Sequence, residues 1–262
     1  MDEQQLSGDY GQVMGEAGKN GMETATQLDM STALQSATLS EEVLAEIVAE
    51  AGPVPELEQY VARPTPALLV VLTGPSGVGK DVTIEKMREM GVRFHYAVTV
   101  TTRKQRPGEE DGVHYHFVSH EEYKRMLEND ELLEHAEIYG NYYGTPSREV
   151  VDPLRRGEDV IMKLDVQGAR TIREREPGAV SIFLAPPSMD EQIRRLFYRK
   201  TEDPQELLAR LKVAGQEMHE LTHFDYLVIN YNNRLDETVH TIQAILLAEK
   251  CRVHPRKVQL AE

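Results

Sequence analysis

The sequence predicts an α/β fold in which a central parallel sheet is covered by helices on both faces. Short apolar runs, typical of buried strands, alternate along the chain with segments of helical character. A glycine-rich turn joins the first of these runs to the first helix, the position at which such folds bind phosphate groups. The chain of 262 residues is long enough for one sizeable core with an appendage.

The first 64 residues differ in charge from the rest of the chain. They carry 12 Asp and Glu residues against Lys19 and Arg63, and so supply −10 of the formal net charge of −15. The remaining 198 residues are nearly balanced, with a net charge of −5. Nucleic-acid binding draws on a large surplus of Lys and Arg, so this balance argues against nucleic acid as a partner.

This acidic extension, residues 1–64, is expected to be largely disordered. Residues 1–36 are polar and have no hydrophobic period, so they cannot bury enough surface to offset the entropy of ordering. Thr38 and Glu41 form a capping-box pattern that begins an amphipathic helix expected over 39–51. We interpret it either as a docking helix or as a transient helix on a tail.

The cysteine content and the start of the chain bear on its compartment. The one cysteine, Cys251, allows neither an intrachain disulfide nor a cluster of thiolate metal ligands, which fits a reducing compartment. The first ten residues have neither the cationic flank nor the apolar stretch of a secretory signal, and no apolar run approaches the roughly 20 residues of a membrane span. We expect a cytoplasmic protein without a membrane partner.

The expected elements follow in order after Pro66. The run ALLVVLTG predicts a strand buried on both faces, and KDVTIEKMREMG predicts the helix after the glycine turn. Further strands are predicted at EDVIMKLD, AVSIFLA and FDYLVIN, separated by helices at VQGARTIRERE, SMDEQIRRLFYRK and LDETVHTIQAILLAEK. Between residues 93 and 145, the segments FHYAVTVTTR, VHYHFVS and ELLEHAEIYG are typical of antiparallel strands in an inserted subdomain.

The stretch GPSGVGKDVT begins at residue 74. Gly74, Gly79 and Lys80 satisfy the pattern G-x-x-x-x-G-K, and Gly77 adds room for backbone to approach a ligand. Glycine permits the backbone angles that point successive N–H groups at phosphate oxygens, and the lysine adds a mobile cation. We prefer a phosphate loop to a plain tight turn because a strand precedes it and a helix follows. The expected phosphate contacts are Gly74, Pro75, Ser76, Gly77, Val78, Gly79 and Lys80.

Two further stretches, TVTTRKQRPGEEDGVHYHFVS and ELLEHAEIYGNYYGT, resemble the nucleotide-acceptor region of guanylate kinases, which are P-loop nucleoside monophosphate kinases. The similarity extends from about Ala67 to the last helix. It implies a three-layer P-loop domain over 65–262, with a mixed-strand GMP-binding subdomain over about 97–150 and a helical lid over about 187–205. It also implies transfer of the γ-phosphoryl group of ATP to GMP or dGMP, with Mg²⁺ as cofactor and the glycine loop binding ATP.

Guanine recognition suits a carboxylate. Guanine presents a ring N–H beside an exocyclic amino group, and one carboxylate accepts from both donors, whereas adenine offers no such pair. The resemblance gives this role to Glu134, with Asp165 alongside it and Thr99 donating to the guanine carbonyl. Thr145 occupies another position on the guanine side. Taken singly, Glu134 is more typical of a solvated strand residue, whereas the joint pattern favours the binding role.

The acceptor's own phosphate needs planar cations and hydroxyl groups. The resemblance assigns Arg103, Arg106, Tyr115 and Tyr143 to that task, and Arg103 to catalysis as well. Tyr115 alone would be interpreted as a packing aromatic residue.

The segment RRLFYRKTEDPQELLARL resembles the family's lid and the helix behind it. Arg195, Arg199 and Arg210 have the family's spacing, and the resemblance assigns them, like Lys80, a catalytic role in offsetting charge during transfer. An arginine-rich helix is also typical of a solvated face. Lys200 replaces the glycine that usually follows the lid arginine. Asn230 matches a family position on the ATP side.

Two positions depart from the family's pattern. Asp81 follows the loop lysine, where the family carries a Ser or Thr hydroxyl that holds magnesium. Lys163 replaces the first aspartate of D-x-D-x-Q-G, while Asp165 retains the second. An uncompensated carboxylate about 4 Å from a phosphate oxygen costs on the order of 4 kcal/mol at an effective dielectric near 20. We therefore expect Asp81 and Lys163 to form a compensated pair, with Asp81 facing magnesium directly or through water; the alternative is two unrelated residues.

Two other functions compete with this one. Related ribose 1,5-bisphosphate kinases also carry G-K-D but lack the guanine-binding stretches, and Glu134 and Asp165 argue against them. Guanylate kinase-like domains of junctional scaffold proteins bind peptides and have lost the phosphate loop, which is intact here at Gly77, Gly79 and Lys80. The sequence does not indicate an oligomeric state.

Overall fold

The computed structural model describes most of the chain beyond residue 60. The described residues are 61–138, 140–198 and 204–261, with Glu41, Ala45, Ala49, Glu50 and Gly52. The chain divides into two units, Met1–Arg63 and Pro64–Glu262. The expectation of disorder over 1–36 lies outside the described residues, as do Arg199 and Lys200. The four described residues of the expected helix over 39–51 are helical.

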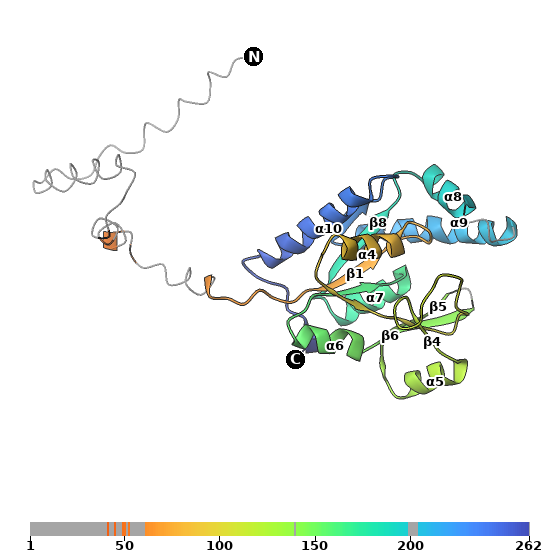
Figure 1. The fold of residues 1–262 in the computed structure, drawn as a ribbon, viewed down its shortest axis with the longest axis horizontal. Coiled ribbons are helices and arrows are strands. Elements are labelled where there is room, and N and C mark those ends of the chain that lie inside the picture. The colour runs from red at the N-terminus through yellow and green to blue at the C-terminus, as the bar shows by residue number, and fades with distance from the viewer. Residues whose placement is uncertain are drawn as a thin grey trace, which may run out of the picture. The chain divides into compact units, whose positions relative to one another are not determined.

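The main sheet confirms the predicted α/β class (Figure 1). Among the described residues it has five strands, all parallel, in the order β2-β7-β1-β8-β9. Their bounds are β1 Leu69–Thr73, β2 His95–Ala97, β7 Val160–Lys163, β8 Val180–Ala185 and β9 Tyr226–Ile229. Each apolar run predicted as a strand of this sheet forms one.

Alternate residues of β1 point into two separate cores, which is why the strand is apolar throughout. Val70 and Leu72 pack with helices α4 and α10 on one face. Leu69 and Val71 pack with helices α6 and α7 on the other. Figure 1 shows these pairs of helices on opposite sides of the sheet. The bounds are α4 Lys80–Glu89, α6 Arg148–Arg155, α7 Val166–Arg175 and α10 Leu235–Lys250.

The chain forms a second sheet between strands β2 and β7 of the first, as the expected insertion. Its described strands run in the order β4-β3-β6-β5, and helix α5 (His120–Glu128) packs beside them through Tyr123 and Met126. The strands are β3 Val100–Thr101, β4 His116–Phe117, β5 Leu132–Ile138 and β6 Asn141–Pro146.

The expectation of antiparallel strands throughout residues 93–145 is wrong at two places. Strand β2 belongs to the main sheet, where it pairs in parallel with β7, because Tyr96 and Val98 contribute to the core beside β1. Within the second sheet β3 pairs in parallel with β4, while the β3–β6 and β5–β6 pairs are antiparallel. The sheet is therefore mixed.

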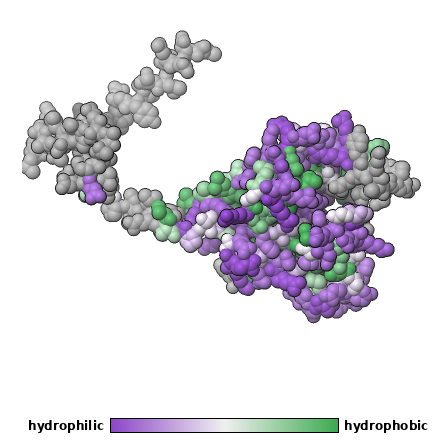
Figure 2. All heavy atoms as spheres, in the orientation of Figure 1, coloured by the Kyte–Doolittle hydropathy of each residue, from purple (hydrophilic) through white to green (hydrophobic). Residues whose placement is uncertain are grey.

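The remaining elements follow β8. Helix α8 (Met189–Tyr198) and helix α9 (Pro204–His219) pack against each other and are followed by the short helix η1 (Glu220–His223), while η2 (Gln259–Ala261) lies against α6. No helix in the described part of the chain has the length and apolar character of a membrane span. On the face shown in Figure 2, the coloured surface is mainly hydrophilic, and apolar residues gather only in small separate patches.

Candidate active site

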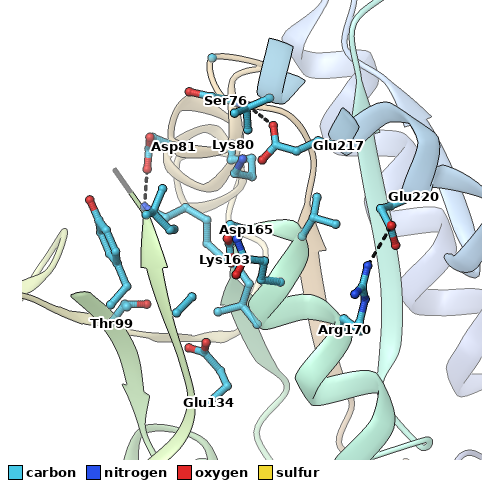
Figure 3. Close-up of a pocket in the computed structure, with 18 of the residues that line it drawn as sticks. Ser76, Lys80, Asp81, Thr99, Glu134, Lys163, Asp165, Arg170, Glu217 and Glu220 are labelled. Carbon is cyan, nitrogen blue, oxygen red and sulfur yellow. Dashed lines mark hydrogen bonds and ion pairs between the residues drawn. The ribbon is translucent and has the colours of Figure 1, made fainter. Parts of the chain in front are cut away.

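A cavity of about 430 Å³ lies between the glycine loop, the ends of β1 and β7, the second sheet and helix α9 (Figure 3). Parallel strands present their carboxyl ends at one edge, which is where ligands bind in such folds. The predicted site residues that line the cavity are Ser76, Gly77, Gly79, Lys80, Asp81, Thr99, Arg106, Tyr115, Glu134, Tyr143 and Asp165. The cavity thus joins the phosphate loop to the predicted guanine side.

The glycine loop is built as predicted: strand β1 ends at Thr73 and helix α4 begins at Lys80. Gly74 has φ +146°, and a Cβ there would lie 2.1 Å from the carbonyl oxygen of Leu184. Gly79 has φ +106°, and its Cβ would lie 2.6 Å from Nδ2 of Asn230. Both positions therefore require glycine.

The Lys80 ammonium group is folded over the loop. Its Nζ donates to the carbonyl oxygens of Gly74 at 2.5 Å and Pro75 at 3.4 Å. Burial lowers its pKa, against the opposing influence of Glu217 and Asp81. The lysine is thus held at the loop by groups that a phosphate oxygen can replace.

Asp81 and Lys163 form the expected pair. The Nζ of Lys163 lies 2.5 Å from Oδ1 of Asp81, and the Lys163 side chain is 7% exposed while that of Asp81 is 56% exposed. Lys163 also lies 4.5 Å from the ring centroid of Tyr115 and 5.7 Å from that of Tyr96. Burial works to lower the pKa of Lys163, yet its pKa lies well above the usual value because Tyr96, Tyr115 and Asp81 favour the charged form. Lys163 is therefore a buried cation between the two halves of the cavity.

Glu134 is a buried carboxylate, 2% exposed, on β5. Its Oε1 accepts a hydrogen bond from Oγ1 of Thr145 at 2.6 Å, across the pair of strands β5 and β6. Burial raises the pKa of Glu134 to about 7, opposed by the Thr145 hydrogen bond and assisted by Asp165. Gly168 lies so close that a Cβ there would be 2.7 Å from Oε2 of Glu134. Thr145 does not line the cavity itself, but its hydrogen bond fixes one carboxylate oxygen of Glu134.

Thr99 carries a buried hydroxyl that has no hydrogen-bond partner among the residues that the structure describes. A buried, unsatisfied hydroxyl costs stability unless a ligand satisfies it.

Asp165 is the N-cap of α7, where its Oδ1 accepts from the N–H of Gly168 at 2.9 Å. Burial raises the pKa of Asp165, and hydrogen bonding to Gly168 opposes the shift.

The two arginines of the RPGE stretch are placed differently. Arg106 lines the cavity. Arg103 lies behind it, where Nη2 donates to Oε1 of Glu109 at 2.7 Å and the guanidinium carbon lies 5.3 Å from the Tyr115 ring centroid. Glu109 also accepts from the backbone N–H of Arg106. Burial alone would raise the pKa of Glu109, but these hydrogen bonds hold it below its usual value. Glu109 was not singled out in the sequence, although it lies within the RPGEE stretch.

Arg195 and Asn230 lie on the outer side of the glycine loop. Arg195 donates to the carbonyl oxygens of Val78 at 3.1 Å and Asn230 at 2.7 Å, and to Oδ1 of Asn232. The side chain of Asn230 donates to the same Val78 oxygen at 2.8 Å. In this state Arg195 ties α8 to the loop and does not line the cavity.

Arg199 lies outside the described residues, and the side chain of Arg210 is not described either. Helix α9 nevertheless contributes a residue that sequence reasoning missed. Glu217 lines the cavity, and its Oε2 accepts from the backbone N–H of Ser76 at 3.2 Å. No local pattern around Glu217 indicates this contact, because 141 positions separate it from Ser76.

Comparison with known proteins agrees with this geometry. Residues 67–249 match the family model described as guanylate kinase. A curated guanylate kinase of Desulfitobacterium hafniense is 45% identical over 186 residues, which cover 71% of this chain and 92% of that protein. One from Clostridium perfringens is 44% identical over 195 residues, covering 74% and 89%.

A plant relative and a solved structure extend the comparison. The chloroplastic/mitochondrial guanylate kinase 2 of rice is 41% identical over 201 residues, covering 76% of this chain and 70% of that protein. The crystal structure of guanylate kinase from Anaplasma phagocytophilum superposes with a TM-score of 0.61 at 35% identity, covering 75% of this chain and 93% of that one.

Proposed function

The chain belongs to the guanylate kinase family, and we propose that the cavity binds its two nucleotides through the residues described above. The protein is an enzyme that transfers a phosphoryl group from ATP to GMP. The observation that carries the assignment is a buried guanine-type acceptor, Glu134, that faces the same cavity as the phosphate-loop lysine, Lys80. We propose that dGMP serves as an acceptor as well, since it carries the same guanine and phosphate groups as GMP.

On the acceptor side, Glu134 accepts from the two guanine donors and Thr99 donates to the guanine carbonyl. The partnerless hydroxyl of Thr99 supports this assignment, because a carbonyl oxygen at that point satisfies it. Arg106, Tyr115 and Tyr143 hold the GMP phosphate. Arg103, which pairs with Glu109 in this structure, is assigned to the same phosphate.

On the donor side, the loop N–H groups and Lys80 hold the phosphates of ATP. Catalysis is positioning and charge stabilisation, since the acceptor phosphate is already an anion and needs no general base. Arg195, Arg199 and Arg210 are assigned to the donor phosphates when the lid closes. Asn230 supports the loop from behind through the Val78 carbonyl.

Magnesium fits the residues present. Mg²⁺ is commonly held by one or two carboxylates together with substrate phosphates, and no group of three acidic, His or Cys ligands is found among the described residues. Asp81 lines the cavity at the first turn of α4 with a partly exposed carboxylate, so we propose that it holds the ion directly or through water. The ion would neutralise charge on the transferring phosphates. Lys163 balances the extra carboxylate.

A charge exchange tests the pairing of Asp81 and Lys163. Asp81→Lys and Lys163→Asp are each expected to lower kcat/KM at least tenfold, because each places two like charges in contact. The double variant is expected to recover the thermal stability that either single variant loses, because opposite charges again face each other, although a lysine at position 81 cannot hold magnesium. A double variant no more stable than the single ones would refute the compensated pair.

An acceptor panel tests the function itself. ADP release is measured with ATP and, in turn, GMP, AMP, CMP, UMP and ribose 1,5-bisphosphate. We expect turnover with GMP to exceed the others by at least 100-fold, the scale on which an unpaired buried polar group rejects a wrong substrate. Turnover with ribose bisphosphate would indicate the sugar-phosphate kinase, and no turnover with any acceptor would favour a binding module.

We also propose that the enzyme works in the cytoplasm. The exposed single cysteine, Cys251, suits a reducing compartment, where an exposed thiol stays reduced. Fractionation of the source cells, with GMP-dependent ADP release as the readout, tests this. Activity confined to an organelle or a membrane fraction would contradict it.

A further inference from the structure

The carboxylate of Glu217 lies where the glycine loop offers a backbone donor. Oε2 of Glu217, on helix α9, accepts from the N–H of Ser76 at 3.2 Å (Figure 3). Backbone N–H groups of such a loop are arranged to bind an anion, because each carries a partial positive charge directed into the concavity. In this structure, the anion at the Ser76 N–H is a side chain of the same chain.

Several charges surround this contact. Lys80, on α4, lies near enough to favour the charged form of Glu217, whereas Asp165, at the start of α7, disfavours it. Burial raises the pKa of Glu217 above its usual value, with the Lys80 charge and the Ser76 hydrogen bond opposing the shift. The Glu217 carboxylate therefore lies near the acidic Asp165 and is stabilised by Lys80 and the Ser76 N–H, the groups proposed to bind phosphate.

The backbone of Ser76 is hydrogen-bonded to both α8 and α9, the helices that flank residues 199–203. Its N–H donates to Glu217 on α9, and its carbonyl oxygen accepts from Nε2 of Gln192 on α8 at 2.5 Å. Gln192 is fully buried. The position of α9 is thus linked to the loop by one carboxylate that a phosphate can replace.

We propose that Glu217 is an internal substitute for a donor phosphate, which ATP must displace from the loop before α9 can move. This inference rests on the proposed binding of ATP to the loop. A phosphate oxygen and the Glu217 carboxylate compete for the Ser76 N–H and for Lys80, and two anions in contact there repel each other. Displacement releases the Glu217 tie between α9 and the loop, so occupancy of the donor site is coupled to the helix that follows the lid.

A neighbouring carboxylate provides a matched control. Glu220, three positions further on, also lines the cavity, but it pairs with Nη2 of Arg170 at 2.9 Å and has no described contact with the loop (Figure 3). It has the same charge and lies directly after the end of α9, at the start of η1. A general effect of removing negative charge from the cavity would appear with either residue, whereas competition for the loop appears only with Glu217.

The test is the Kd for ATP with Mg²⁺, without GMP, measured by titration calorimetry on the full chain. Glu217→Gln keeps the side-chain shape and an oxygen that accepts from Ser76, but removes the charge. We expect its Kd for ATP to fall by about tenfold, the scale of one partly screened like charge close to the phosphate. Glu220→Gln is expected to keep the wild-type Kd within about twofold.

The outcomes separate this proposal from the proposed function. Glu217→Ala, which cannot occupy the loop at all, is expected to bind ATP at least as tightly as Glu217→Gln. An unchanged or raised Kd in the glutamine variant overturns the substitution of carboxylate for phosphate, as does an equal gain in Glu220→Gln. Absence of ATP binding in the wild-type protein would instead contradict the kinase assignment.

Discussion

At the scale of single residues, burial of Glu134 lowers the stability of the free protein and favours the binding of a ligand that satisfies the carboxylate. A buried carboxylate is costly when it is ionised, and burial here raises its pKa to about 7. Guanine recognition needs the ionised form, because only that form accepts from both donors. The cost of burial is offset when GMP binds.

GMP binding by Glu134 is therefore expected to depend on pH. The KM for GMP should rise about tenfold from pH 8 to pH 6, as the free carboxyl becomes protonated. Glu134→Gln is the control, since GMP itself titrates equally in both proteins. The variant should have at least 100-fold lower kcat/KM for GMP and no extra pH slope of its own. The same slope in both proteins would remove Glu134 from the guanine site.

The stability of the protein should show the opposite trend at this residue. Because the folded pKa of Glu134 lies above its usual value, the native state binds more protons than the unfolded state between about pH 4.5 and 7. Its contribution to the free energy of unfolding consequently falls as pH rises through this window. Glu134→Gln is expected to have the higher Tm at pH 8, and calorimetric melting at pH 5 and 8 measures the difference. A lower Tm at pH 8 would contradict this reasoning.

Thr99 allows a separate test of the guanine carbonyl contact. Thr99→Val removes the hydroxyl and keeps the shape, and since that hydroxyl has no partner among the described residues, the free protein should lose no stability. The KM for GMP should rise by roughly five- to tenfold, the value of one hydrogen bond. A variant that loses stability without a change in KM would indicate a structural role.

At this scale the sequence predicts much of the site. Residues that bear a recognisable chemistry within a short motif, such as Lys80, Glu134 and the pair of Asp81 and Lys163, lie where the pattern indicates. Glu217 is different, because its function depends on helix α9 lying against the loop. No hydrophobic periodicity or local motif in the sequence predicts the contact between Glu217 and Ser76.

At the scale of elements, the glycine loop is held by its neighbours as much as by its own backbone. The carbonyl oxygen of Val78 accepts from both Arg195 on α8 and Asn230 after β9. Arg195, one of the three arginines expected at the donor phosphates, thus anchors the loop in this structure. The spacing of the arginines in the sequence predicts that Arg195 lies on this helix, but it does not predict which group Arg195 contacts. Main-chain carbonyl oxygens, here those of Val78 and Asn230, compete with a phosphate for the same guanidinium group.

Gly74 is the element's most constrained position. Gly74→Ala should lower the free energy of unfolding by more than about 2 kcal/mol, since its Cβ would overlap the Leu184 carbonyl oxygen and the positive φ is strained. Gly140→Ala is a control for positive φ in general, because Gly140 has φ +72° and open space around a Cβ. Chemical denaturation of both variants measures the difference. Equal losses would show that backbone angle alone, without the close approach, sets the cost.

The insertion shows where element prediction from sequence fails. Residues 95–97 lie in a segment that the sequence predicts to be an antiparallel strand, yet they pair in parallel with β7 in the main sheet. Strand character is local, but the choice of partner depends on which core the side chains fill. Here Tyr96 fills the core beside β1.

At the scale of the whole molecule, the described cavity is built entirely from residues of the second unit. We therefore propose that 65–262 is the catalytic domain and that the acidic extension is not part of the chemistry. Deletion of residues 1–60 is expected to leave kcat and both KM values within about twofold, measured by ADP release. A larger loss would assign the extension a role in the domain's activity.

We expect one cavity to bind ATP at the loop and GMP at Glu134 simultaneously. Calorimetric titration with a ligand that joins adenosine and guanosine through five phosphates tests it most directly. We expect one ligand per chain, bound at least 100-fold more tightly than ATP or GMP alone, because the two halves bind as one molecule. Either Lys80→Met or Glu134→Gln should remove most of this gain. Binding no tighter than that of ATP, or a Kd unaffected by Glu134→Gln, would contradict the account.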